Sequence, residues 1–237
     1  MIAGTPAPAP ARNWARPRQN RICPSILSAD FSRLGDEIAT VARAGADFLH
    51  ADVMDGQFVP NLTFGPILVQ AMRRLTSLPL DVHLMVVDPL RFLEEFARAG
   101  ADHLIVHVEA VEDPLRSLHE IRARGLRAGL AIKPGTPLTR YLPALSGCDI
   151  ALVMTVEPGA GGQAFLEGSP ERIAAVRAAI DRENLDCLLG VDGGIGPSTA
   201  PVAARAGADT FIAGHSIFKT SDPPEAVRSL RRSLERV

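Results

Sequence analysis

One hexapeptide, Ala-Arg-Ala-Gly-Ala-Asp, occurs three times in this chain, at residues 42–47, 97–102 and 204–209. The copies start 55 and 107 positions apart, close to two and four units of about 27 residues. Repetition at a fixed period indicates a repeated supersecondary unit. Each copy ends a helical pattern with a glycine suited to a left-handed cap, and an apolar run follows it. Eight such units fill the chain after a short N-terminal segment.

The local patterns agree with eight units. Apolar, strand-like runs cover residues 22–27, 48–54, 80–85, 103–109, 128–133, 151–156, 187–192 and 210–214. Between them apolar residues recur at helical spacing, weakly only at 138–145, where Pro143 interrupts the pattern. Strands alternating with helices indicate parallel pairing, and eight units favour a closed (β/α)8 TIM barrel of the α/β class. An open doubly wound sheet is the structural alternative.

Composition excludes several classes of partner. A net charge of −2 and a pI near 6.3 provide no basic surface for nucleic acid. No apolar run is long enough to predict a membrane span. The three cysteines are an odd number without Cys-x-x-Cys spacing, which argues against a disulfide framework and favours a reducing cytoplasm.

The N-terminal segment differs from the rest of the chain. Residues 1–20 are rich in proline and alanine, contain arginines and lack any acidic residue. Such a segment buries too little apolar surface to order itself and lacks the apolar core of a secretory signal. We therefore predict a disordered tail over 1–20 and a single barrel domain with catalytic function over 21–237.

Four polar residues stand at the ends of predicted strands. They are His50, Asp52, His83 and Asp192. Side chains alternate along a strand, so these four share the inward face, while Val82, Leu84, Leu189 and Val191 face outward. Barrel active sites lie at the C-terminal ends of the strands. Two imidazoles and two carboxylates there suit one divalent metal ion, which the residues leave open as Zn, Fe, Mn or Co. A single inward histidine is more often structural. His107, also inward, could be a fifth polar group, but we expect it to be structural or to support the ligands from behind.

Three later strand ends are rich in glycine, at residues 157–163, 192–195 and 213–216. Glycine allows backbone N–H groups to approach an anion closely, and TIM barrels often bind phosphate at their last loops. Although each glycine run alone is ordinary for a loop, the three together indicate a phosphorylated small substrate.

Several long motifs occur in an order that resembles the ribulose-phosphate 3-epimerase family over residues 21–235. They include Pro-Ser-Ile-Leu-Ser-Ala-Asp at 24–30, His-Ala-Asp-Val-Met-Asp-Gly at 50–56, Asp-Val-His-Leu-Met at 81–85 and Met-Thr-Val-Glu-Pro-Gly at 154–159. The resemblance implies a metal-dependent isomerase that interconverts D-ribulose 5-phosphate and D-xylulose 5-phosphate in the pentose phosphate pathway of carbohydrate metabolism. It also implies a ribulose-phosphate-binding barrel that forms homo-oligomers, either dimers or hexamers.

The resemblance also implies roles for individual residues. It makes His50, Asp52, His83 and Asp192 metal ligands, with Asp52 and Asp192 as the acid/base pair on opposite faces of C3. The substrate would contact Ser25, His83, Gly159, Ala160, Gly161, Gly162, Gly193, Gly194, Gly214 and His215. Met54, Met85 and Met154 would form a thioether wall around the intermediate, although they also suit an ordinary core.

The chain departs from the family pattern at three positions. Gln57 replaces a histidine, Ala160 replaces a phenylalanine of the sixth loop, and His215 replaces a serine at the eighth strand end. The loss of the phenylalanine concerns closure of a loop over the site. Lys133 is a known alternative to asparagine in the family.

Other functions remain open at this point. An epimerase of a phosphorylated hexulose, such as allulose 6-phosphate, would use the same ligands. A barrel lyase is disfavoured because the Asp-x-Lys-x-x-Asp run of the decarboxylases is absent, and Lys133 is the one strand lysine for a Schiff base. A non-catalytic barrel would require a broken metal set, and the set is intact.

Overall fold

The computed structural model describes residues 19–235 and residue 237. Its eight strands form one parallel sheet in the order β1-β8-β7-β6-β5-β4-β3-β2. They are β1 (Arg21–Pro24), β2 (Leu49–Met54), β3 (Leu80–Met85), β4 (His103–His107), β5 (Arg127–Ile132), β6 (Ile150–Met154), β7 (Leu188–Asp192) and β8 (Thr210–Ala213). A bridge between Ser25 and His50 joins the edges formed by β1 and β2. The sheet is therefore a nearly closed barrel, which confirms the predicted fold over the open sheet.

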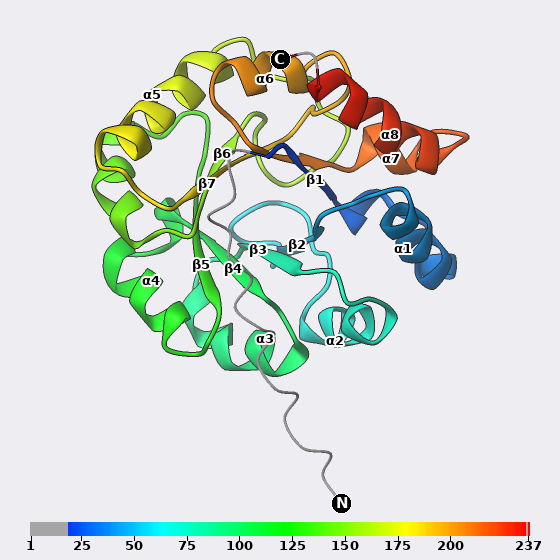
Figure 1. The fold of residues 1–237 in the computed structure, drawn as a ribbon. Coiled ribbons are helices and arrows are strands. Elements are labelled where there is room, and N and C mark those ends of the chain that lie inside the picture. The colour runs from blue at the N-terminus through cyan, green and yellow to red at the C-terminus, as the bar shows by residue number, and fades with distance from the viewer. Residues whose placement is uncertain (1–18, 236) are drawn as a thin grey trace, which may run out of the picture.

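Helices cover the outside of this ring (Figure 1). They are α1 (Leu34–Arg43), α2 (Pro66–Leu75), α3 (Leu93–Ala99), α4 (Pro114–Arg122), α5 (Ser169–Arg182), α6 (Ala200–Arg205), α7 (His215–Phe218) and α8 (Pro223–Leu234). Short 3-10 helices span Ile26–Ser28, Phe31–Arg33, Pro89–Phe92, Val108–Ala110, Leu138–Arg140 and Leu142–Gly147. Two of them stand where the pattern at 138–145 was weak. Pro143 has no N–H to continue an α-helix, so this connection is made of tighter turns.

Three predicted strands run two or three residues past the ends of the observed ones. The runs 22–27, 103–109 and 151–156 end as strands at Pro24, His107 and Met154. After two of them the chain turns into a 3-10 helix while its apolar residues stay buried, as Ile26 and Val108 do. Buried apolar residues thus continue beyond the hydrogen-bonded part of these strands. Because the predicted ends follow apolar residues, they lie too far along the chain.

The strands separate two apolar layers. Outward residues such as Val82, Leu84, Leu189 and Val191 pack with the buried faces of the helices, as predicted. A smaller cluster fills the barrel interior with Cys23, Phe48, Ile105, Ala131, Ile150, Leu152, Met154 and Ile212. This inner apolar cluster fills the barrel beneath the polar residues at the strand ends. Those polar residues therefore face only one end of the barrel.

The repeated hexapeptide has a structural explanation at the opposite, N-terminal end of the barrel. The glycine of each copy has a positive φ, which is 99° at Gly45, 95° at Gly100 and 110° at Gly207. The aspartate of each copy then accepts a backbone N–H from the first or second residue of the preceding strand. These bonds are Ile22 N to Asp47 Oδ2 (2.9 Å), Leu80 N to Asp102 Oδ2 (2.8 Å) and Leu189 N to Asp209 Oδ1 (3.0 Å).

An arginine from a neighbouring helix completes each copy by donating to both the aspartate and the glycine carbonyl. The pairs are Arg231 with Asp47 (2.7 Å), Arg73 with Asp102 (2.8 Å) and Arg177 with Asp209 (2.8 Å). A fourth aspartate, Asp149, accepts from Ala128 N (2.8 Å) and from Arg122 (3.1 Å) without the hexapeptide. We call these four sets the Asp–Arg clasps. They join β1 to β2, β3 to β4, β5 to β6 and β7 to β8.

Both ends of the described chain lie near this face. Asn20 donates from its side chain to the carbonyl of Leu234 (3.2 Å). Residues 1–18 of the predicted tail lie outside the described residues, so disorder over 1–20 stays a prediction. Among the helices that the structure describes, none combines the length and apolar character of a membrane-crossing segment.

Candidate active site

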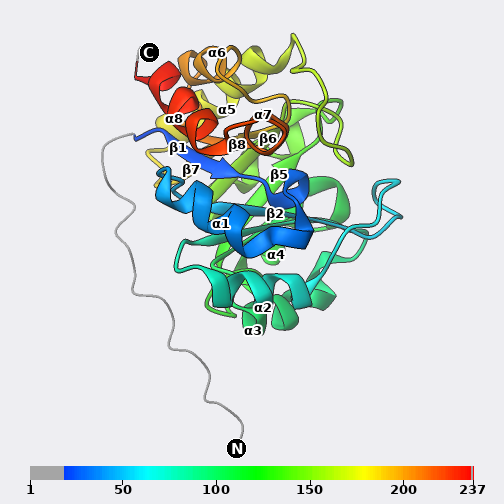
Figure 2. The ribbon, with the colours of Figure 1, turned by 90° about the vertical axis from the view of Figure 1, so that its right-hand side faces the viewer.

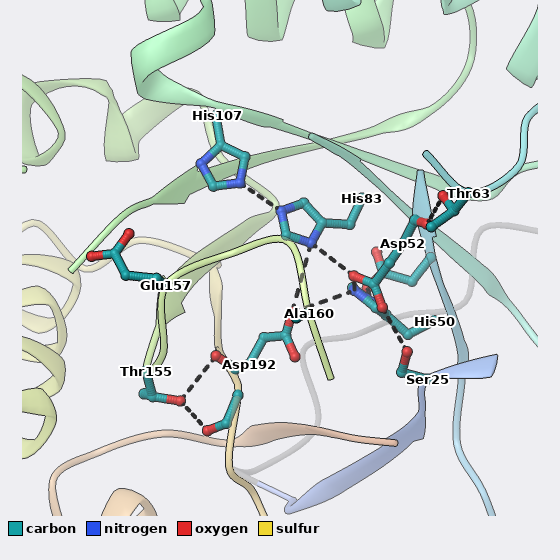
Figure 3. A network of polar contacts seen from close by, with 12 residues as sticks. Ser25, His50, Asp52, Thr63, His83, His107, Thr155, Glu157, Ala160 and Asp192 are labelled. Atoms are coloured by element: carbon teal, nitrogen blue, oxygen red, sulfur yellow. Dashed lines mark hydrogen bonds and ion pairs between the residues drawn. The ribbon is translucent and has the colours of Figure 1, made fainter. Parts of the chain in front are cut away.

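The four predicted ligand residues meet at the C-terminal mouth of the barrel. His50 and Asp52 come from β2, His83 from β3 and Asp192 from the end of β7. Their ligand atoms all lie within 4.8 Å of one another. Both histidines are fully buried, Asp52 is buried and Asp192 is partly exposed. The structure therefore gathers four residues from three strands around one point (Figure 3).

His50 is oriented by a carboxylate below it. Its Nδ1 lies 2.7 Å from Asp81 Oδ2, so the ring donates its Nδ1–H to this carboxylate. Its Nε2 is buried without a hydrogen-bond partner and lies 3.2 Å from Asp52 Oδ1. Burial alone would lower the pKa of His50, but Asp52 and Asp81 raise it well above the usual value. A buried nitrogen without a partner, in so negative a site, fits a bound cation.

His83 is held from the opposite side. Its Nδ1 faces Asp52 Oδ1 (3.2 Å) and Asp192 Oδ2 (3.7 Å), while its Nε2 lies 2.9 Å from His107 Nε2. His107 Nδ1 in turn lies 3.0 Å from Glu109 Oε2. Burial lowers the pKa of His107 to about 4, which keeps this ring neutral.

The two carboxyl groups have opposite electrostatic environments. Burial would raise the pKa of Asp52, but His50 and His83 hold it well below its usual value, and Ser25 Oγ donates to Asp52 Oδ2 (2.6 Å). Burial and the charge of Asp52 raise the pKa of Asp192 to about 6. Environments that separate two pKa values in this way suit one proton acceptor and one proton donor.

A cavity of about 230 Å³ opens above these carboxyl groups. The predicted substrate and wall residues that line it are Ser25, Met54, Met85, Met154, Gly159, Ala160, Gly161, Gly162, Gly193, Gly194, Gly214 and His215. Ser28, Ser198 and Ser216, which the sequence did not single out, line it as well. His83 was expected to touch substrate but is not among the lining residues, because it is fully buried beside Asp52. The cavity is of a size for a small metabolite.

One end of the cavity is lined by closely packed glycine backbone. A Cβ atom at Gly194 would stand 2.4 Å from Phe165 N, and one at Gly214 would stand 2.9 Å from Ser28 Oγ. The ring of His215 lies against the backbone of Gly162, whose Cβ position is 3.3 Å from His215 Nδ1. Glycine backbone from three separate loops therefore packs closely at this end of the cavity.

The loop after β6 reaches across the mouth. Figure 2 shows it projecting from the same end of the barrel as the loop after β2. Asn61 Nδ2 donates to the carbonyl of Gly159, which ties the two loops together. Gln163 Nε2 donates to the carbonyls of Glu157 (2.7 Å) and Ala160 (2.8 Å), which closes the loop on itself. These bonds hold the loop without an aromatic side chain at Ala160.

Comparison with known proteins agrees on one family. Residues 21–218 match the model of the "Ribulose-phosphate 3 epimerase family". A ribulose-phosphate 3-epimerase of Mycobacterium leprae is 47% identical over 89% of this chain and 93% of its own length. The enzyme of that name in Bacillus subtilis is 45% identical over 90% of this chain and 99% of its own length.

Solved structures resemble the fold at low sequence identity. A protein called KGPDC from Streptococcus mutans superposes with a TM-score of 0.70 at 16% identity, over 93% of this chain and 99% of its own. Orotidine 5'-phosphate decarboxylase from Pyrococcus horikoshii gives 0.65 at 22% identity, over 91% of this chain and 100% of its own. At such identities the likeness concerns the barrel alone.

Proposed function

This chain belongs to the ribulose-phosphate 3-epimerase family and is an isomerase of pentose phosphate metabolism, and we propose that Asp52 and Asp192 carry out its proton transfers. The reaction interconverts D-ribulose 5-phosphate and D-xylulose 5-phosphate. The observation that carries the proposal is the pair of carboxyl groups, from β2 and β7, whose pKa values are shifted in opposite directions beside one cavity.

Inversion at C3 defines what the two carboxyl groups must do. A proton leaves C3 toward one face, and a proton returns to C3 from the other face. One carboxyl group alone would return the proton to the face it came from and regenerate the starting sugar. Asp52, ionised between His50 and His83, is suited to accept. Asp192, whose raised pKa lets it keep a proton to higher pH than an ordinary aspartate, is suited to donate. In the reverse reaction the two roles exchange.

A metal ion fits between these groups. His50 Nε2, His83 Nδ1 and one oxygen each of Asp52 and Asp192 form a set that can bind a divalent ion. We propose Zn, Fe, Mn or Co, because imidazole and carboxylate ligands accept all four. When bound, the ion would act as a Lewis acid that stabilises the negative charge developing on the substrate oxygens.

The remaining cavity residues suit the rest of the substrate. Met54, Met85 and Met154 line the cavity and offer no N–H or O–H group to compete for the transferred proton. We place the phosphate at the converging loops, against Gly161, Gly162, Gly193, Gly194, Gly214 and His215. Ser25, which donates to Asp52, would contact the sugar near the reacting carbon.

Incubation in deuterated water tests the proposed function. The protein is given ribulose 5-phosphate, the sugars are analysed for deuterium at C3, and the metal content of the same sample is measured. We expect xylulose 5-phosphate with deuterium at C3 from a protein that contains one divalent metal ion. Product without deuterium would contradict the two-base route, and a faster reaction with allulose 6-phosphate would reassign the substrate.

The change His83→Ala should remove metal and activity together. Loss of one imidazole opens the ligand set, so we expect metal affinity to fall at least about 100-fold. Metal content is measured by mass spectrometry after dialysis, and turnover is measured on the same sample. His119→Ala, at an exposed position of α4, is the control. A metal-free His83→Ala protein with full activity would rule out the metal site.

The change His215→Ser should weaken substrate binding without slowing catalysis. An imidazole beside Gly162 can donate a hydrogen bond to the phosphate, while the reacting carbon lies at the other end of the cavity. We expect the KM for ribulose 5-phosphate to rise roughly ten-fold and kcat to stay the same. Steady-state kinetics beside the exposed control His119→Ser measure both. An unchanged or lower KM would show that His215 is not a phosphate ligand.

We further propose a homo-oligomer, a dimer or a hexamer, in the cytoplasm, with residues 21–237 as one catalytic domain. Leu62 and Ile67, beside the loop after β2, are 78% and 86% exposed. Apolar side chains so exposed are suited to an interface between copies of the chain. Light scattering of the purified protein measures the state directly.

A further inference from the structure

A chain of polar contacts leads from the end of β4 to the proposed metal site. Glu109 Oε2 lies 3.0 Å from His107 Nδ1, and His107 Nε2 lies 2.9 Å from His83 Nε2. Figure 3 shows the rings of His107 and His83 facing one another, with His83 directed toward Asp52. Neither Glu109 nor His107 lines the cavity, so neither contacts substrate.

The hydrogen bonds of this chain can run in only one direction. Glu109 is a carboxylate and accepts with both oxygens, since Lys133 N–H donates to Oε1 (2.8 Å). Burial would raise the pKa of Glu109, but the bonds from its neighbours lower it to about 2. His107 must therefore carry its proton on Nδ1. Its Nε2 is then an acceptor.

The contact between two ring nitrogens fixes the proton of His83. A hydrogen bond between His107 Nε2 and His83 Nε2 requires one proton, and His107 has none to give at that position. The proton therefore belongs to His83 Nε2. A neutral His83 is left with a lone pair on Nδ1, the atom that lies 3.2 Å from Asp52 Oδ1 and 3.7 Å from Asp192 Oδ2. A lone pair facing two carboxyl groups is favourable only when a cation binds between them, which is the arrangement of the proposed metal site.

We infer that Glu109, acting through His107, is a positioning residue that fixes the tautomer of His83 for metal binding. The inference rests on the metal site proposed above. The other ligand histidine needs no intermediate ring, because Asp81 accepts directly from His50 Nδ1. Each ligand histidine is thus oriented by its own carboxylate. Asp81 contacts His50 directly, whereas Glu109 acts on His83 through the ring of His107.

The surroundings hold this chain in place. His107 is fully buried, and the ring of Phe58 packs against it with centroids 4.8 Å apart. Lys133 Nζ lies 3.7 Å from the centroid of the Phe58 ring. The backbone N–H of Lys133 also donates to Glu109. Lys133 therefore contacts both Phe58 and Glu109, the two residues that pack against or bind His107.

The change Glu109→Gln tests the inference with almost no change in shape. Lys133 N–H requires an acceptor, so the amide oxygen should take the place of Oε1 and the NH2 group should face His107. His107 would then accept on Nδ1 and carry its proton on Nε2. His83 would accept on Nε2 and present an N–H group to the metal site, which opposes a cation.

Zinc binding and ring-nitrogen NMR supply the readouts. Competition with a chromophoric chelator measures zinc affinity, which we expect to fall about 10- to 100-fold in Glu109→Gln. In the zinc-loaded wild type, ¹⁵N spectra should show the proton of His107 on Nδ1 and that of His83 on Nε2. In metal-free Glu109→Gln the proton of His107 should be on Nε2. Glu112→Gln, an exposed change on the same connection, should match the wild type in every measurement.

The outcomes separate this inference from the proposed function. Wild-type protein that binds no zinc would refute the metal site itself. Wild-type protein that binds zinc, with a Glu109→Gln variant of equal affinity and unchanged tautomers, would overturn the role of Glu109 and leave the metal site standing. The wild-type spectrum is decisive even if the variant does not fold, because a His107 proton on Nε2 contradicts the proposed direction.

Discussion

Replacing Asp192 by Asn is expected to stop net epimerisation while leaving half of the proton exchange intact. The amide cannot carry a proton to or from C3, so turnover should fall by about 10² to 10⁴-fold. Asp52 remains and can still remove the C3 proton of the one substrate whose hydrogen faces it. In deuterated water that substrate should gain deuterium and keep its configuration.

Asp52→Asn should show the complementary behaviour. Asp192 would then serve the opposite face, so exchange should occur with the other pentulose phosphate. Each variant is incubated separately with ribulose 5-phosphate and with xylulose 5-phosphate, and deuterium at C3 and inversion are followed together. If the two carboxyl groups lie on opposite faces of C3, each variant should incorporate deuterium into a different one of the two sugars.

Metal content decides how these results are interpreted, since both residues belong to the ligand set. Each sample is assayed for metal, and turnover is expressed per metal-loaded protein. An Asn variant that retains metal and near wild-type inversion would remove that carboxyl group from the reaction. Exchange of the same single substrate by both variants would contradict their placement on opposite faces.

The alternation of side chains along the strands predicted the centre of the candidate site. In a barrel, every second residue of a strand faces inward and the others face outward. His50, Asp52, His83 and Asp192 needed only a strand end and the correct parity to be placed together. The same rule could have identified Asp81, which shares the parity of His83 and supports His50. Asp81 lies near the start of β3, however, and only residues near strand ends were considered as site residues.

Other features depend on contacts that sequence spacing does not encode. Glu109 follows the end of β4, where alternation no longer applies, and its function depends on a backbone N–H of Lys133 from another loop. The hexapeptide revealed the period of the barrel but not its cause. Its arginine partners lie outside the repeat at unrelated distances along the chain, and Asp149 forms a clasp without the repeat.

The clasp between β7 and β8 leads to the second large effect, on stability. Arg177 and Asp209 have side chains that are only 11% and 8% exposed, and their closest atoms are 2.8 Å apart. Arg177→Ala would leave a buried carboxylate without its cation. Breaking a buried pair in this way costs about 3–5 kcal/mol of the free energy of unfolding. Urea denaturation followed by circular dichroism measures this loss.

The clasp formed by Arg122 and Asp149 is a matched control that differs in burial. Arg122 is 40% exposed, and Arg127 also approaches Asp149 at 4.0 Å, so Arg122→Ala should cost no more than about 1 kcal/mol. Equal losses in the two variants would show that burial does not set the strength of a clasp.

The dependence on pH tests the same mechanism. Burial raises the pKa of Asp209 and the charge of Arg177 lowers it, so Arg177→Ala should raise that pKa further. An aspartate of the unfolded chain loses its proton near pH 4, whereas Asp209 of the folded variant would keep it to higher pH. The folded state then binds more protons, and its stability falls as pH rises. The loss caused by Arg177→Ala should therefore be small near pH 4 and full at pH 7, while a loss that does not change with pH would mean that packing against Gly207, and not charge, is what Arg177 provides.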